Sequence, residues 1–194
     1  MGSPLPDLDA VTLRDVYPGR AGRLDLYHDG DDRRLQDAVR DATEDGAAPV
    51  VLDLHGLVYL GYSFAKHTVV RLLHGADRPV VATGPDDPTF LDGLEDALAY
   101  GKAALYLAAS VSDIGRLGRV LGATTPALSQ TFDVLLRLGP LGTGELAAEL
   151  DTSPQNAKNR VDRLVQLGLA SRSKVSSPSG GVEWWNRLAV RGGP

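Results

Sequence analysis

The stretch LDLHGLVYLGYSFAKHTVV, residues 52–70, decides the fold of the first half of the chain. It begins inside the apolar run PVVLDL of residues 49–54, which is typical of a strand covered on both faces. After a short break, apolar residues recur at helical spacing over residues 63–73. A buried strand followed by a surface helix predicts one crossover unit of a parallel sheet, with Ser63 as the residue that caps the helix.

The same alternation of strands and helices continues on both sides of this stretch. Two short apolar segments, residues 10–17 and 22–28, are separated by PGRAG and are typical of a hairpin or a pair of strands. Further helices are predicted at residues 31–44 and from Pro88 onward, and further buried strands at residues 79–83 and 103–109. This order predicts right-handed crossovers onto a mainly parallel sheet, in an α/β domain over residues 1–110.

Composition limits the classes of protein that the chain can represent. Its 194 residues suffice for two small domains, with 43% hydrophobic and 23% charged residues. No apolar run approaches the roughly 20 residues of a membrane-spanning helix, and the N-terminus lacks a signal-peptide pattern. There is no cysteine, so four histidines are the only soft metal ligands. We therefore expect a soluble cytoplasmic protein with no cofactor, no metal site and no membrane partner.

The net charge of -5 is unevenly distributed along the chain. Residues 1–110 contain 10 basic and 18 acidic side chains, whereas residues 111–194 contain 10 basic and 7 acidic ones. Within residues 154–174 five basic side chains accompany a single acid, Asp162. Positive charge concentrated in this way indicates contact with nucleic acid.

The periodicity changes near residue 125. Residues 111–126 place apolar side chains at helical spacing but include three glycines, and they are interpreted as a helical connector. From residue 127 onward, three short helices precede two segments that resemble the strands of a hairpin. Three helices and a hairpin predict an α+β winged helix-turn-helix domain over residues 127–194.

The third of these helices has the strongest functional pattern. Ser153 and Pro154 provide an N-cap and a first-turn proline. Apolar residues then fall on one face, and amide and basic side chains fall on the other. Amides pair with adenine and basic groups with guanine or phosphate, so the helix is predicted to bind double-stranded DNA, unless its polar face serves protein contact instead. The predicted base contacts are Gln155, Asn156, Asn159 and Arg163, and the predicted phosphate contacts are Lys158 and Arg160.

The hairpin that follows adds to this prediction. Arg172 and Lys174 lead into a tip of Ser, Pro and Gly over residues 176–181, which suits either a wing on the DNA backbone or a plain loop. Strand periodicity places Trp184 on the side of Leu188 and Trp185 on the opposite side. Trp185 is thus a candidate for a dimer or inter-domain contact, or for a ring lying flat on the domain surface.

These patterns resemble two known families. Residues 127–190 resemble winged-helix regulators of the MarR and ArsR kind, which implies sequence-specific DNA binding as a homodimer. Residues 10–110 resemble the STAS domain of anti-sigma factor antagonists, in which Asp53 matches the aspartate that ends a strand and Ser63 the phosphorylated serine. A related STAS-like group shares the Ser-Phe-Ala that begins at Ser63, but it carries an acidic residue where this chain has Lys66.

Two hypotheses follow for the whole chain. The first is a DNA-binding transcriptional regulator with a STAS-like regulatory domain, and the alternative is a partner-switching protein whose Ser63 region binds a kinase-type protein. A phosphate on Ser63 would be favoured at a helix start, although capping alone explains the residue. The chain lacks the common hydrolase, phosphate-loop and metalloprotease motifs, so no enzyme is predicted. A triad of Asp53, Ser63 and His67 is not favoured, because no strained turn exposes the serine.

Overall fold

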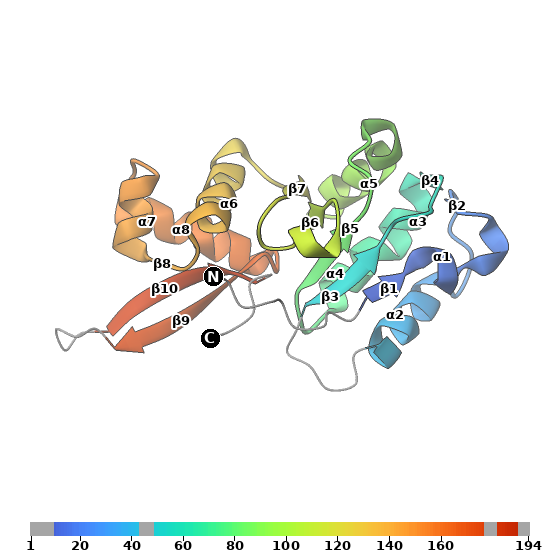
Figure 1. Cartoon of the computed structure of the whole chain (residues 1–194), viewed down its shortest axis with the longest axis horizontal. Coiled ribbons are helices and arrows are strands. Elements are labelled where there is room, and N and C mark those ends of the chain that lie inside the picture. Colours follow the sequence, from blue (N-terminus) through green and yellow to red (C-terminus); the bar gives the residue numbers. More distant parts are fainter. Residues whose placement is uncertain (1–9, 43–48, 177–181, 190–194) are drawn as a thin grey trace.

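The computed structural model describes residues 10–42, 49–176 and 182–189 of the chain. At its centre is a five-stranded sheet (Figure 1), whose strands run parallel except for the last, which pairs antiparallel. In sheet order these are β1 (Ala10–Thr12), β3 (Val50–Asp53), β5 (Val80–Thr83), β6 (Ala104–Ala108) and β7 (Arg119–Gly122). The prediction of an α/β domain with a mainly parallel sheet is confirmed.

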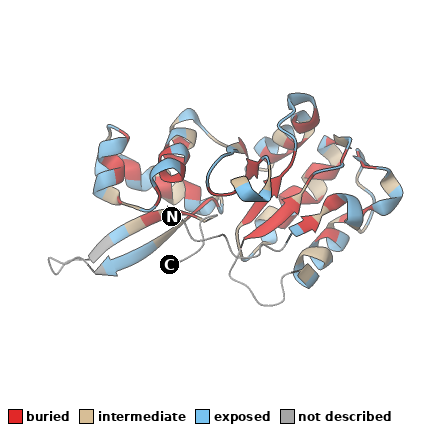
Figure 2. Ribbon diagram, viewed as in Figure 1, coloured by how far each residue is buried: buried red, intermediate tan, exposed pale blue. Residues whose placement is uncertain are grey.

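Helices cover one face of this sheet. Successive side chains of a strand point to opposite faces, so Leu52 and Leu105 pack against the helices, whereas Val51 and Tyr106 face the other way. Both sets are buried, and Figure 2 shows buried residues concentrated along the central strands. The covering helices are α2 (Asp31–Ala42), α3 (Tyr62–His67), α4 (Val69–Gly75) and α5 (Pro88–Tyr100).

The first two apolar segments do not form a hairpin, contrary to one of the predictions. β1 pairs in parallel with β3, and the chain then turns through α1 (Leu13–Val16) and a 3-10 turn, η1 (Pro18–Arg20). β2 (Arg23–Leu24) pairs in parallel with β4 (Tyr59–Leu60), in a separate two-stranded sheet. Both segments therefore find partners that lie far away in the sequence.

The predicted helical connector is also wrong. Residues 111–113 form a 3-10 turn, η2 (Val111–Asp113), and β7 then adds to the sheet beside β6. The buried Tyr106 hydroxyl donates to the Leu117 carbonyl oxygen at 2.7 Å and so anchors the intervening loop. Gly118, at φ +153°, lies so close to β6 that a Cβ would be 2.4 Å from the Leu107 carbonyl oxygen. The apolar residues of the segment 111–126 have helical spacing, but the segment pairs with β6 and Gly118 lies close to the β6 backbone. These contacts, rather than the spacing, determine its structure.

The second half of the chain forms three helices and a small antiparallel sheet in the order β8-β10-β9. The predicted tip of the hairpin, apart from the backbone of Ser176, lies outside the described residues. Along the chain these elements are α6 (Pro126–Leu138), β8 (Leu141–Gly142), α7 (Thr143–Glu149), α8 (Pro154–Gln166), β9 (Ala170–Ser176) and β10 (Val182–Leu188).

The two halves share a hydrophobic cluster. The face of the sheet that the other helices leave uncovered packs against α6, where the Phe132 and Tyr106 rings lie 5.4 Å apart between centroids. The same cluster continues through Val161 of α8 to Leu188 of β10. The position of α6 on the sheet therefore determines where α8 is held relative to the sheet.

Candidate nucleic-acid interface

α8 begins where its sequence predicts. The Ser153 hydroxyl accepts a hydrogen bond from the Asn156 backbone N–H at 3.2 Å, and Pro154 occupies the first turn. Ala157, Val161 and Leu164 are fully buried, so the opposite face of the helix is turned outward. The inward and outward faces predicted for this helix are those that the structure has.

The outward amides are exposed and form hydrogen bonds with neighbouring side chains. The Gln155 side-chain amide donates to the Asn159 oxygen at 2.9 Å, and the Asn156 amide donates to the Thr152 hydroxyl at 2.8 Å. Hydrogen bonds between exposed groups have a small net free energy because water competes for both partners. These amides can therefore exchange their present partners for the edges of bases without a large cost.

Arg160 and Arg163 point to different places. The Arg160 guanidinium lies 3.5 Å from the side-chain oxygen of Gln130 on α6, so it turns toward that helix. Arg163 donates to the Gln166 side-chain oxygen at 3.2 Å and stays on α8. Arg160, predicted to contact phosphate together with Lys158, is therefore turned toward α6.

Asp162 is neutralised by two cations. Lys158 donates to one carboxylate oxygen at 2.6 Å, and Arg172 of β9 donates to the other at 2.5 Å. The pKa of Asp162 lies below its ordinary value of 3.8, and the hydrogen bond from Lys158 is the largest cause. Desolvation raises this pKa, whereas the charge of Arg172 lowers it further. The carboxylate therefore ties α8 to the hairpin, and its repulsion of a nearby phosphate is offset.

Arg172 belongs to the interior of this domain more than to its surface. Its side chain is only 13% exposed, and its Nε donates to the Asn186 side-chain oxygen at 3.1 Å. Asn186 is fully buried and donates in turn to the Leu141 carbonyl oxygen at 3.1 Å. Lys174, in contrast, is exposed, so only one of the two predicted hairpin cations is accessible to a ligand.

Trp184 is a surface residue that the strand periodicity assigned to the side of the core. Its side chain is 42% exposed, with the Arg172 guanidinium 5.0 Å and the Lys174 amine 5.2 Å from the ring centroid. The ring borders a hollow of about 310 Å³ between α7, α8 and the hairpin. Trp184 pairs with Lys174 across the hairpin, and strand periodicity gave no signal that its ring would be exposed. The hollow is lined by Thr143, Gly144, Pro154, Gln155, Lys158, Arg172 and Trp184.

Ser63 is not the N-cap of its helix. Gly61 occupies the cap position of α3, and Ser63 is the second helical residue, half-buried. Lys66 lies over the Tyr100 ring, 4.2 Å from its centroid. His67 lies against Tyr27, with ring centroids 5.0 Å apart. The capping role proposed for the serine is therefore wrong.

The strand aspartate has partners of its own. Asp53 lies 2.6 Å from the His55 ring nitrogen and accepts a hydrogen bond from the Thr83 hydroxyl at 3.2 Å. Neither contact involves Ser63 or His67. Within the described ranges, no three His, Asp or Glu side chains are grouped as they would be to hold a metal ion.

Comparison with protein-family models finds none that matches this chain, and comparison with curated proteins finds no significant relative. Across the part of the chain that the structure describes, no helix combines the length and the apolar character that crossing a membrane requires. The functional argument therefore depends on the geometry of α8 and its surroundings.

Proposed function

We propose that this protein is a DNA-binding transcriptional regulator. The observation that carries the proposal is α8, which presents exposed amides beside an exposed lysine and a tryptophan of the adjoining hairpin. The order α6, β8, α7, α8, β9, β10 is compatible with a winged helix-turn-helix, which supports the proposal because the recognition helix of that motif enters the major groove. The sheet domain, which resembles the STAS fold, would hold the regulatory site.

The side chains divide into three roles in this proposal. Gln155, Asn156, Asn159 and Arg163 read base edges, since amides and guanidinium groups can pair bidentately with purines. Lys158 and Lys174 contact phosphates, and the Trp184 ring lies against a deoxyribose of the strand between α8 and the hairpin. Arg160 and Arg172, predicted as phosphate contacts, act instead by positioning α8.

Fluorescence anisotropy with duplex DNA from upstream of the protein's own gene tests the proposal. Affinity should fall with salt at a log–log slope of about −0.9 for each phosphate contacted. Lys174→Ala should weaken binding to all sequences alike and reduce the slope by about 1. Asn159→Ala should cost about 1–3 kcal/mol and relax the preference at one base pair.

Arg33→Ala provides the matched control, because Arg33 is an exposed cation on α2, in the sheet domain. Its affinity and salt slope should equal those of the unchanged protein. Binding that does not depend on salt, or that Arg33→Ala weakens as much as Lys174→Ala, would contradict a DNA interface on α8.

We also propose that the protein is a homodimer in solution. Of the apolar residues in the segment 111–126, Ile114 and Leu121 are buried in the two hydrophobic clusters. Leu117 and Val111 remain, 66% and 41% exposed, on the loop before β7. Leu117→Glu should convert the dimer to a monomer in light scattering, and a protein that is already monomeric at micromolar concentration would contradict the proposal.

A second candidate function, partner switching, is favoured by the surface around Ser63. Tyr62 and Tyr100 are exposed, their rings pack edge to face with centroids 6.3 Å apart, and Lys66 lies against both. Tyrosine is enriched in protein interfaces relative to the rest of the surface. A kinase-type partner that binds the unchanged protein but not Ser63→Asp in a pull-down would support this function. Equal capture of both forms would contradict it.

A further inference from the structure

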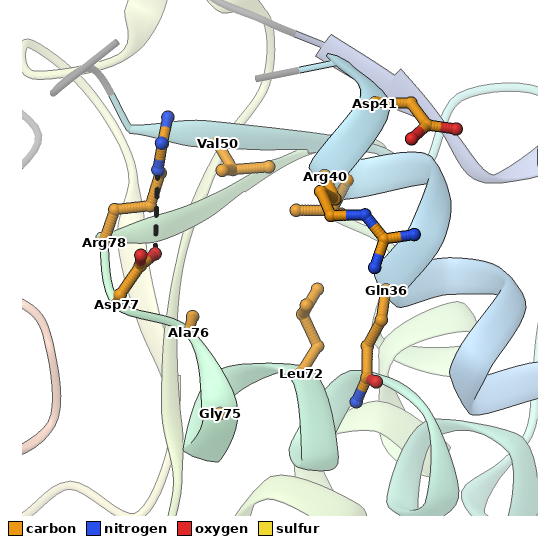
Figure 3. Close-up of a pocket in the computed structure, with 10 residues that line it drawn as sticks. Gln36, Arg40, Asp41, Val50, Leu72, Gly75, Ala76, Asp77 and Arg78 are labelled. Atoms are coloured by element: carbon orange, nitrogen blue, oxygen red, sulfur yellow. Dashed lines mark ion pairs between the residues drawn. The ribbon is translucent and has the colours of Figure 1, made fainter. Parts of the chain in front are cut away.

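The sheet domain contains a second hollow, far from α8 in the fold. It has a volume of about 680 Å³ and lies between α2, the end of α4 and the beginnings of β3 and β5 (Figure 3). Small-molecule sites commonly have about 300–1,000 Å³. The lining residues are Gln36, Val39, Arg40, Asp41, Val50, Leu72, Gly75, Ala76, Asp77 and Arg78.

The hollow combines an apolar floor with a charged rim. Val39, Val50, Leu72 and Ala76 provide the apolar surface. Figure 3 shows the guanidinium groups of Arg40 and Arg78 on opposite sides of it. Among the described lining residues there is no Ser, Thr, Cys, His or Lys, and the only carboxylates are those of Asp41 and Asp77 at the rim. The arrangement is suited to binding rather than to reaction.

In the part of the chain that the structure describes, Arg78 has a hydrogen-bond donor that lacks an acceptor. Its NH1 atom is buried and finds no hydrogen-bond partner among the described residues. Its ion pair with Asp77 is long, at 3.8 Å, and Asp77 is 93% exposed, so solvent weakens it. An arginine stays charged, and a buried N–H without an acceptor is unfavourable. The side chain is still 23% exposed and borders the hollow, so an acceptor there can reach the outer edge of the guanidinium.

The described acids of the rim leave the Arg78 NH1 atom without a partner. Figure 3 shows the Asp41 carboxylate turned away from the hollow and the Asp77 carboxylate turned to the Arg78 Nε. The hollow therefore presents the Arg78 guanidinium and the Gln36 amide above apolar side chains, whereas the Arg40 guanidinium on the opposite side is paired with Asp37 at 2.5 Å. A planar carboxylate matches the paired N–H donors of a guanidinium, and an apolar body matches the floor.

We propose that this hollow binds a small carboxylate with an apolar body, and that Arg78 receives the carboxylate. The carboxylate then accepts hydrogen bonds from two N–H donors on one edge of the guanidinium, in place of the long contact with Asp77. The apolar body then covers Val39 and Ala76, the partly exposed apolar residues of the lining. This site is independent of α8, so it holds or fails separately from DNA binding.

Titration of the whole protein with octanoate, followed by amide nuclear magnetic resonance, tests the proposal. Octanoate should cause saturable shifts in residues 36–41 and 72–78, and 1-octanol, which lacks the charge, should bind at least about tenfold more weakly. Sodium sulfate, which lacks the apolar body, should cause no saturable shift there. Absence of saturable octanoate binding, or equal binding of octanol, would overturn the proposal.

Two variants test the charged part and the apolar part of the hollow independently. Arg78→Met should reduce octanoate affinity about tenfold, whereas the matched Arg33→Met, on an exposed arginine outside the lining, should leave it unchanged. Gly75→Leu fills the hollow without a change of charge, and no atom lies within 4 Å of the position of its Cβ, so the fold should tolerate it. Octanoate shifts that persist in Gly75→Leu would place binding elsewhere and overturn the assignment.

Discussion

At the scale of single residues, Asp162 shows how one carboxylate serves two opposed requirements. It holds Lys158 and Arg172, and so fixes α8 to the hairpin, but its charge lies on the face proposed for DNA. Removal of the charge should therefore lower stability and raise DNA affinity together. Sequence alone identified Asp162 only as the single acid among five basic side chains, because Arg172 is ten residues away and reaches Asp162 through the fold.

Asp162→Asn should lower the free energy of unfolding at pH 7 by about 1 kcal/mol or less, because the pairs are partly exposed. The pKa of this carboxyl is depressed in the folded state, so its contribution is present above 3.8 and is lost as the pH falls through the lower folded value. Chemical denaturation of both proteins at pH 7 and at about pH 3 checks this. A difference that persists undiminished in acid would contradict it.

Asn186 makes a larger contribution because it is buried. Asn186→Ala removes the acceptor for Arg172 and the donor to the Leu141 carbonyl oxygen, and it should destabilise the protein by about 2 kcal/mol. Asn159→Ala, on the exposed face of α8, should change stability by no more than about 0.5 kcal/mol. Urea denaturation measures the free energy of unfolding of both variants. Equal losses of stability in the two would contradict the structural role of Asn186.

At the scale of elements, the glycines of helices show that the same residue can act in opposite ways. Gly93 of α5 lies so close to the turn before α3 that a Cβ would be 2.7 Å from the Leu60 carbonyl oxygen. Gly144 of α7 has no atom within 4 Å of the equivalent position. Helical propensity treats both glycines alike, and only packing distinguishes them.

Gly144→Ala should stabilise the protein by up to about 1 kcal/mol, because alanine is the better helix former. Gly93→Ala should instead destabilise it, since the clash is with backbone atoms that must move. Thermal unfolding of the two variants gives the sign of each effect. A higher melting temperature in both variants would contradict the close packing of Gly93 in α5 against the turn before α3.

At the scale of the whole molecule, α6 joins the sheet to the elements proposed to bind DNA. Phe132 is fully buried between these parts, against Tyr106 of β6. Because one hydrophobic cluster runs from β3 to β10, we expect both halves to unfold in a single transition. A helical connector, as the sequence predicted, would have left them more independent.

Phe132→Ala should cost about 3–5 kcal/mol and separate the unfolding of the two halves. Differential scanning calorimetry would then resolve two transitions where the unchanged protein has one. Phe90→Ala, which removes a buried ring from the helix side of the sheet, is the control and should lower the melting temperature without separating the transitions. Two transitions in the unchanged protein would contradict the coupling.

The sequence by itself determined the features that depend on local spacing: the buried parallel strands, the cap and start of α8, and the inward and outward faces of that helix. Tertiary structure decided the rest. β7 is a strand because β6 offers an edge, and Ser63 lies inside a helix because Gly61 takes the cap. Arg172 turns inward because Asp162 and Asn186 accept its donors. Local periodicity is a property of one segment, whereas these outcomes depend on partners that only the folded chain brings together.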